Sequence, residues 1–176
     1  MVTQVRKPKV TPKPTRQPKM LTLWINHLSL LAGDPSVATS FNAVNSGVGS
    51  GLAGLIIQST TTGSTAQGGG NKVLEAAIQV PPGYKVKGVR VGFENSNPRS
   101  FISNIRLSQV QNPPATAAVL LDDPTPRNTA GPTFAESVST TIDPSKGPLL
   151  LSLGVNFGNT ADRIVLRGVG LHLVAV

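Results

Sequence analysis

Few side chains in this sequence could carry a reaction, and two histidines come first among them. His27 and His172 are the two histidines of a 176-residue chain that has no cysteine, so thiolate zinc sites, iron–sulfur clusters and a cysteine nucleophile are excluded. A hydrolytic site would need a histidine beside an acid and a serine, yet no Gly-x-Ser-x-Gly, His-Glu-x-x-His or P-loop pattern is present. His172 lies in the alternating run 170–174, which is typical of the outer face of a last strand. We therefore predict no catalytic residue, no enzyme activity and no cofactor.

Asp122 and Asp123 form the one adjacent pair of acids. With loop carbonyls they could hold a hard cation such as calcium, which prefers about six to eight oxygen ligands. The competing interpretation is that Asp123 caps the turn at Pro124. We favour the turn, so Asp122 and Asp123 are weak calcium candidates and no metal is predicted.

Two further patterns carry little chemistry. Gly49, Gly51 and Gly54 match Gly-x-Gly-x-x-Gly, which binds a pyrophosphate only where a helix follows, and here a β-branched run follows instead. This pattern predicts a flexible glycine-rich loop. Trp24 and Tyr84 are single aromatic residues without partners in the sequence, so no aromatic surface for sugars or bases is evident, although exposed aromatic residues could converge in space.

The charge distribution is the strongest functional signal. The formal net charge is +8, and no acid occurs in the first twenty residues. Four prolines in the same segment exclude a helix. Cationic side chains on such an arm could neutralise phosphates or contact a neighbouring subunit; a solvated tail is the alternative. We predict nucleic-acid or assembly contacts for its six cations: Arg6, Lys7, Lys9, Lys13, Arg16 and Lys19.

The remaining chain must position any site, and it alternates short apolar runs with turn residues. Val89, Val91 and Phe93 alternate with Arg90, Gly92 and Glu94, which predicts a strand with one buried and one wet face. Segment 21–31 fits a helix or a strand, and 60–70 is typical of a flexible loop. The turn spacing favours an all-β fold, an antiparallel β-sandwich of jelly-roll type over residues 21–176, behind the extended basic arm 1–20. Strands are predicted at 39–44, 52–59, 72–80, 85–94, 101–110, 117–121, 134–142, 149–157 and 163–174.

A basic arm from Arg6 to Lys19, followed by a β-rich body, resembles the plan of small single jelly-roll virion coat and decoration proteins. The part from Lys72 onward is also similar to uncharacterised bacterial β-sandwich modules, with 80–86 leading a strand and 164–174 closing the domain; these imply no activity. The first resemblance implies a non-enzymatic structural protein that self-assembles into a homo-oligomer or lattice, in a virion or an intracellular assembly. Its arm would contact nucleic acid or neighbouring subunits.

Two other functions stay open. One is a carbohydrate-binding or adhesion-type β-sandwich module whose loops hold a glycan, with calcium at Asp122 and Asp123. The other is a hydrolase on a β scaffold, which would need His27 or His172 near an acid in a cleft. Polar residues interrupt the apolar run 21–32, and no run approaches the length of a membrane span, so we expect no signal peptide and no membrane partner.

Overall fold

The predicted alternation of apolar runs and turns gives eleven strands in the computed structural model, which describes residues 20–42, 54–111 and 116–176. Two 3-10 helices, η1 (His27–Ser29) and η2 (Pro144–Lys146), lie among them. The strands are β1 (Met20–Ile25), β2 (Leu31–Ala32), β3 (Val37–Asn42), β4 (Gly54–Ser59), β5 (Val73–Ile78), β6 (Tyr84–Asn95), β7 (Phe101–Val110), β8 (Ala117–Asp123), β9 (Thr133–Ile142), β10 (Leu149–Asn156) and β11 (Ile164–Ala175).

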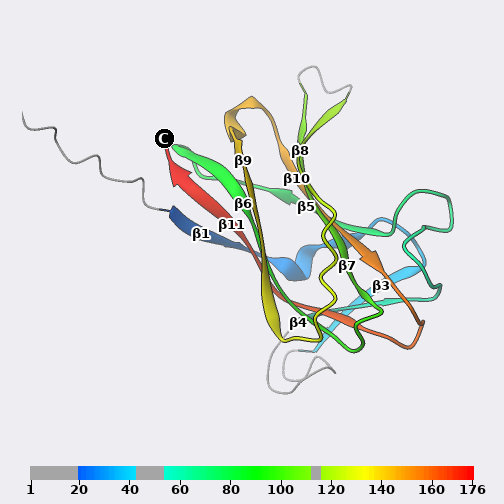
Figure 1. Cartoon of the computed structure of the whole chain (residues 1–176). Coiled ribbons are helices and arrows are strands. Elements are labelled where there is room, and N and C mark those ends of the chain that lie inside the picture. The colour runs from blue at the N-terminus through cyan, green and yellow to red at the C-terminus, as the bar shows by residue number, and fades with distance from the viewer. Residues whose placement is uncertain (1–19, 43–53, 112–115) are drawn as a thin grey trace, which may run out of the picture.

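The described strands form two antiparallel sheets. The first has the order β3-β4-β11-β6-β9, with β1 paired to the second half of β11, and the other has the order β2-β5-β10-β7-β8. Figure 1 shows β1, β11, β6 and β9 on one side of the molecule and β5, β10, β7 and β8 on the other. The predicted all-β antiparallel sandwich is thus confirmed, whereas the predicted arm lies outside the described residues.

The core lies between the two sheets and is built from alternate strand positions. Val89, Val91 and Phe93 of β6 are completely or almost completely buried, as are Leu151 and Leu153 of β10 on the facing sheet. Successive side chains of a strand point to opposite faces, so this alternation sends the neighbouring positions of β6 outward. The apolar pattern of the sequence therefore fixes which face of each sheet meets solvent.

The predicted wet face of β6 is only partly wet. Glu94 is 7% exposed because Arg167 of β11 covers it, with Arg167 Nε 3.2 Å from Glu94 Oε2. Gly92 is buried as well, beneath an aromatic ring described below. The alternation correctly predicts which β6 side chains point outward, but it cannot show which residues of other strands cover them.

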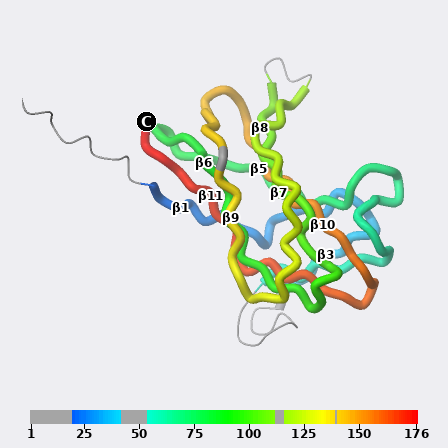
Figure 2. The backbone as a smooth tube through the Cα atoms, viewed as in Figure 1, coloured from blue at the N-terminus to red at the C-terminus, as the bar shows by residue number. Residues whose placement is uncertain are grey.

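The ambiguous segment 21–31 contains both kinds of structure. β1 pairs with β11 in the register Met20↔Val174 and Leu23↔Leu171, and Figure 2 shows the two strands side by side although they come from opposite ends of the chain. Asn26 then ends the strand, since its Oδ1 accepts a hydrogen bond from Leu28 N at 3.2 Å and starts the 3-10 turn.

The loop over residues 60–70 is tied to the body by a lysine. The Nζ of Lys72, whose residue is fully buried, donates to the carbonyl oxygens of Thr61, Thr62 and Gly63 at 2.6, 3.1 and 3.2 Å. The buried ammonium group thereby finds three acceptors on a loop whose residues are exposed or half-exposed, and it ties the start of that loop to the body. A lone lysine in a sequence gives no sign of this role, and the predicted flexibility of the rest of the loop stays a prediction.

Candidate functional site

An exposed aromatic pair lies on the outward side of the first sheet. Trp24 of β1 is 53% exposed and Phe134 of β9 is 49% exposed. Their ring centroids are 6.0 Å apart and their planes are tilted by 58°. Because β11 and β6 lie between β1 and β9, the two rings approach one another across two intervening strands. Large apolar side chains left in water are informative where they gather, and these two are in contact.

Glycines on the two intervening strands make this approach possible. Gly170 of β11 stands opposite Trp24, and Gly92 of β6 stands opposite Phe134 and Gly168. A Cβ atom at Gly170 would lie 3.1 Å from Trp24 Cε3, and one at Gly92 would lie 2.5 Å from Phe134 Cε1. The rings therefore rest on bare backbone, which only glycine leaves accessible.

Arg90 of β6 lies beside the aromatic pair. Its guanidinium carbon is 4.4 Å from the centroid of the Phe134 ring, within the range of a cation–π contact. Its Nε lies 3.3 Å from Glu136 Oε1, close enough for an ion pair although the hydrogen is not aligned for a hydrogen bond. The ring and the carboxylate hold the guanidinium in place while about a third of the side chain stays exposed.

Glu136 of β9 also contacts a histidine. His172 Nε2 meets Glu136 Oε2, and His172 Nδ1 lies 3.3 Å from Thr22 Oγ1 on β1. A neutral imidazole protonated at Nε2 satisfies both contacts, since it donates to the carboxylate and accepts from the hydroxyl. His172 thus lies on the outer face of β11, as predicted, yet it is 6% exposed because Thr22 and Glu136 flank it.

Together these outward groups form what we term the aromatic face. It presents two aromatic rings, an arginine and a carboxylate on the four neighbouring strands β1, β11, β6 and β9. The rings lie over a glycine floor, by which we mean the backbone at Gly92, Gly168 and Gly170. Its members are Thr22, Trp24, Arg90, Gly92, Phe134, Glu136, Gly168, Gly170 and His172.

The two candidate calcium ligands, Asp122 and Asp123, bond to different partners. Asp122 Oδ1 accepts hydrogen bonds from Arg106 Nε at 3.1 Å and Asn104 Nδ2 at 2.8 Å, and these contacts hold the pKa of Asp122 below its usual value. Asp123 pairs with Arg127, which lowers the pKa of that carboxyl strongly. The two carboxylates thus serve two different arginines, an arrangement that does not favour a shared cation, and the calcium interpretation stays a prediction.

The turn interpretation of Asp123 has direct support. Asp123 Oδ1 accepts a hydrogen bond from the backbone N–H of Thr125 at 3.0 Å, across Pro124. This is the local side-chain cap that an aspartate before a proline favours. Within residues 20–42, 54–111 and 116–176, no group of three or more His, Asp or Glu side chains could hold a metal ion.

The remaining predicted residues are not brought to a common site. His27 lies in η1, where burial lowers the pKa of its imidazole, and its Nε2 has no hydrogen-bond partner in the described part of the chain. Arg6 to Lys19 lie outside the described residues, so their predicted contacts stay predictions. Gly49 and Gly51 also lie outside, whereas Gly54 starts strand β4 rather than a helix, as expected. No helix of the described chain is long and apolar enough to cross a membrane.

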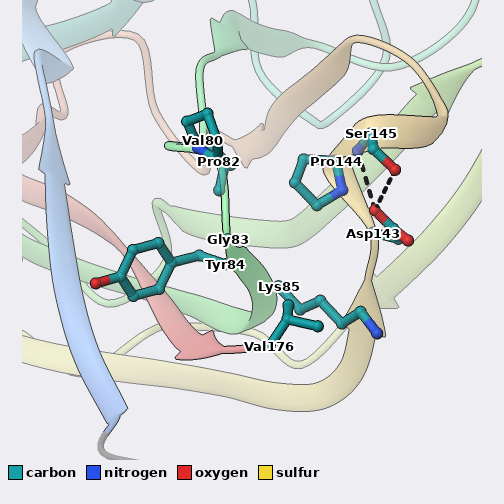
Figure 3. A pocket seen from close by; sticks show the side chains of 9 residues that line it. All are labelled: Val80, Pro82, Gly83, Tyr84, Lys85, Asp143, Pro144, Ser145 and Val176. Atoms are coloured by element: carbon teal, nitrogen blue, oxygen red, sulfur yellow. Dashed lines mark hydrogen bonds between the residues drawn. The ribbon is translucent and has the colours of Figure 1, made fainter.

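An open cavity of about 450 Å³ lies at one end of the sandwich (Figure 3). Tyr84 and Lys85 of β6 form part of its wall, and Asp143 and Ser145 lie opposite. Asp143 Oδ1 already accepts hydrogen bonds from Ser145 N and Ser145 Oγ at 3.0 and 2.7 Å, which lower the pKa of the carboxyl. Because the carboxylate of Asp143 is already hydrogen-bonded within its own turn, this cavity offers no free acidic side chain, and we place the candidate site on the aromatic face.

The partner of Trp24 was not visible in the sequence, which left open that exposed aromatic residues converge in space, and Trp24 and Phe134 do so. Phe134 meets Trp24 through the register of β1, β11, β6 and β9, which is non-local. The available signal was the glycine spacing: Gly168 and Gly170 alternate on one strand, and Gly92 follows Arg90 on another. Outward glycines at alternate positions indicate that something lies close to the sheet.

No protein-family model matches the sequence, and no curated protein matches it. Among solved structures, the chain is similar to the CBM22-1–GH10 modules of the N-terminal endo-1,4-beta-D-xylanase 10B of Clostridium thermocellum, solved complexed with xylohexaose. The TM-score is 0.53 at 10% identity, over 86% of this chain and 27% of that one. It is also similar to the CBM22-1 xylan-binding domain of Paenibacillus barcinonensis Xyn10C, with a TM-score of 0.51 at 8% identity over 92% of this chain and 99% of that domain.

A third similar structure comes from work on the promiscuous specificity of carbohydrate-binding modules from the β-sandwich superfamily. Its TM-score is 0.51 at 13% identity, over 82% of this chain and 57% of that chain. At these identities the likeness shows the fold alone.

These neighbours contradict the first functional prediction. The virion coat or decoration function is wrong, because the similar structures named above are carbohydrate-binding modules. Capsid formation, self-assembly and nucleic-acid binding gain no support from them. The error arose because a basic arm followed by a β-sandwich is a plan that proteins of several functions share. What the comparisons show is that this chain has the fold of carbohydrate-binding β-sandwich modules.

Proposed function

We propose that this protein is a carbohydrate-binding module that holds a glycan on its aromatic face. The observation that carries the proposal is the exposed contact between Trp24 and Phe134. A pyranose ring has faces of C–H groups that pack against an aromatic ring, and such packing buries apolar area on both partners. Two adjoining rings on a glycine floor offer that kind of surface without a deep pocket.

Polar groups of the aromatic face suit the hydroxyl groups of a sugar. Each hydroxyl can donate and accept, and the face has a guanidinium donor at Arg90 beside a carboxylate acceptor at Glu136. Both side chains are part-exposed and fixed by contacts with neighbours, so a ligand could bond to them without ordering them first. The xylan-binding and xylohexaose-bound neighbours of the same fold support this assignment.

The size of the patch favours a glycan over a protein partner. A standard protein–protein interface buries roughly 1,600 Å² in total, with aromatic anchors enclosed by a wide rim. The aromatic face has only two exposed rings, Trp24 and Phe134. The charged side chains of Arg90 and Glu136 lie directly beside them, so no wide rim is present. A sugar of one or a few units matches this area.

Affinity electrophoresis in gels containing soluble xylan, galactomannan or mixed-linkage β-glucan tests the proposal. We expect at least one polysaccharide to retard the wild-type protein, and the Trp24→Ala and Phe134→Ala variants to lose that retardation. Leu120→Ala is the matched control, because Leu120 is an exposed apolar residue of β8 outside the aromatic face. The proposal fails if no polysaccharide retards the wild type, or if both aromatic variants migrate as it does.

A further inference from the structure

Trp24 lines a second feature of the surface besides the aromatic face. On the other side of β1, a groove of about 330 Å³ lies between β1 and β5, which belong to different sheets. Trp24 is therefore shared between the aromatic face and this groove. The groove is lined by Leu23, Trp24, Ile25, Asn26, Ser29, Ala76, Ala77 and Gln79.

The strand pairing explains why the groove is open. Within the described chain β1 pairs with β11 alone, so its other edge is free. β5 pairs on that side with β2, but only through Leu31↔Glu75 and Ala32↔Leu74. The following residues of β5, Ala76 and Ala77, pair with β10 on one side, but on the β2 side they have no described strand beside them, and they carry small side chains. The two free edges therefore face one another across a gap that no large side chain fills.

The groove has amide groups that are available to a ligand. Asn26 and Gln79 are exposed. Asn26 Oδ1 accepts from Leu28 N, while its Nδ2 and both amide atoms of Gln79 form no hydrogen bond with the described residues. An amide both donates and accepts, as sugar hydroxyl groups require. Asn26 and Gln79 thus place hydrogen-bonding groups beside the ring of Trp24 in the groove, as Arg90 and Glu136 do beside the ring of Phe134 on the aromatic face.

We infer that the ligand is a linear glycan chain that crosses the aromatic face and continues over the edge of β1 into the β1–β5 groove. Asn26 and Gln79 bind the sugar units beyond those that pack on Trp24 and Phe134. The distance from β9 to β1 is three strand spacings, or about 14 Å, which already exceeds a single sugar ring. The site thus binds the interior of a chain and gains affinity with chain length. This inference rests on the proposed function.

Calorimetry with β-1,4-linked xylo-, cello- and manno-oligosaccharides of one to six units tests the inference. In the series that binds best, we expect wild-type affinity to rise from the disaccharide to the hexasaccharide. Gln79→Ala should weaken hexasaccharide binding about threefold to tenfold, the effect of losing one or two hydrogen bonds, and leave trisaccharide binding unchanged. Asn26→Ala should act in the same way, but it also removes the cap of η1, so Gln79→Ala is the deciding variant.

Matched variants separate the failure of this inference from that of the proposed function. Gln111→Ala, at an exposed glutamine after β7, should bind every oligosaccharide as the wild type does. If Gln79→Ala binds the hexasaccharide with full affinity, or if length has no effect, the groove is not part of the site although the aromatic face still binds sugar. If the wild type binds no oligosaccharide, both the inference and the proposed function are overturned.

Discussion

The two sheets of the sandwich present different outer faces to solvent. On the first sheet, the aromatic face exposes Trp24 and Phe134 over glycines. On the second sheet, one row of side chains from four strands forms what we term the polar face, consisting of Glu75, Ser152, Arg106 and Asp122, together with the adjoining Asn104.

The groups of the polar face bond to each other. Ser152 Oγ donates to Glu75 Oε1 at 2.8 Å, and Asp122 accepts from both Arg106 and Asn104. The aromatic face instead leaves about half of each ring exposed to water, although the rings contact one another and Arg90 lies over Phe134. The second sheet exposes single apolar side chains such as Leu31 at its edge, but within the described chain only the first sheet brings two exposed aromatic rings into contact, and we therefore assign binding to that face.

The largest expected effect comes from removing a ring of the aromatic face. Trp24→Ala should weaken glycan binding by about 2 kcal/mol, or roughly thirtyfold, as for a central aromatic contact. Calorimetry with the best-bound polysaccharide measures this change. Arg106→Ala removes a comparably large side chain from the polar face and should leave the affinity unchanged; equal losses in the two variants would remove the distinction between the faces.

A smaller effect should follow from filling the glycine floor. Gly92→Ala places a Cβ within 3.0 Å of three Phe134 ring atoms, so the ring must rise from the sheet. We expect binding to weaken by about 1 kcal/mol with little change in melting temperature, since a side chain moves and the backbone does not. Gly154→Ala is the matched change on β10 of the second sheet, and its dissociation constant should equal that of the wild type. Unchanged binding by Gly92→Ala would mean that the ring position is unimportant.

The carboxylate of the aromatic face should matter less than the rings. Glu136→Gln keeps the shape but removes the charge that faces Arg90 and His172. Binding should weaken by about 0.5–1 kcal/mol, the contribution of one polar contact. Stability should change little, because the glutamine amide oxygen can still accept from the buried His172 and the ion pair with Arg90 is part-exposed. Titration calorimetry and thermal unfolding of the same sample give both values. A gain in affinity would show that Glu136 opposes the ligand.

The smallest effect concerns stability on the polar face. Arg106 and Asn104 lower the pKa of Asp122 from its ordinary value near 3.9, so folding favours the charged carboxylate. This stabilisation is complete above about pH 4 and disappears as the pH falls through the lowered pKa. Asp122→Asn should therefore reduce the unfolding free energy at pH 7 by less than about 1 kcal/mol, because the pair is exposed.

Urea unfolding of both proteins at pH 7 and at several values below 4 measures that difference. The two unfolding curves should converge as the pH is lowered, and glycan binding at pH 7 should be the same for both. A difference in stability that grows with acidity would contradict the assignment of Asp122 to a paired, charged state.

Local patterns predicted most of the fold. The strand expected at 101–110 is β7 (Phe101–Val110), and the buried alternation of Val89, Val91 and Phe93 is present in β6. These features depend on residue type and spacing within one segment, which a sequence displays directly. Segment 21–31 was ambiguous because a strand, a 3-10 turn and a second short strand occupy it in succession.

The candidate site could not be predicted in the same way. Trp24 and Phe134 meet only because β1 pairs with β11, β11 with β6 and β6 with β9, and each of these registers is non-local. The basic arm attracted the functional prediction because charge is visible in a sequence, whereas contact between distant strands is not. The outward glycines in 88–92 and 168–170 were the only feature within single segments that indicated a close approach of other side chains to the sheet.

Trp24 is the single tryptophan of the chain and lies on the aromatic face, so its fluorescence tests the central claim directly. Titration of the wild-type protein with xylohexaose, cellohexaose and mannohexaose should give a saturable change in tryptophan emission with at least one of them, and Phe134→Ala should weaken that response. Emission that stays constant with all three glycans, up to millimolar concentration, would contradict carbohydrate binding on this face.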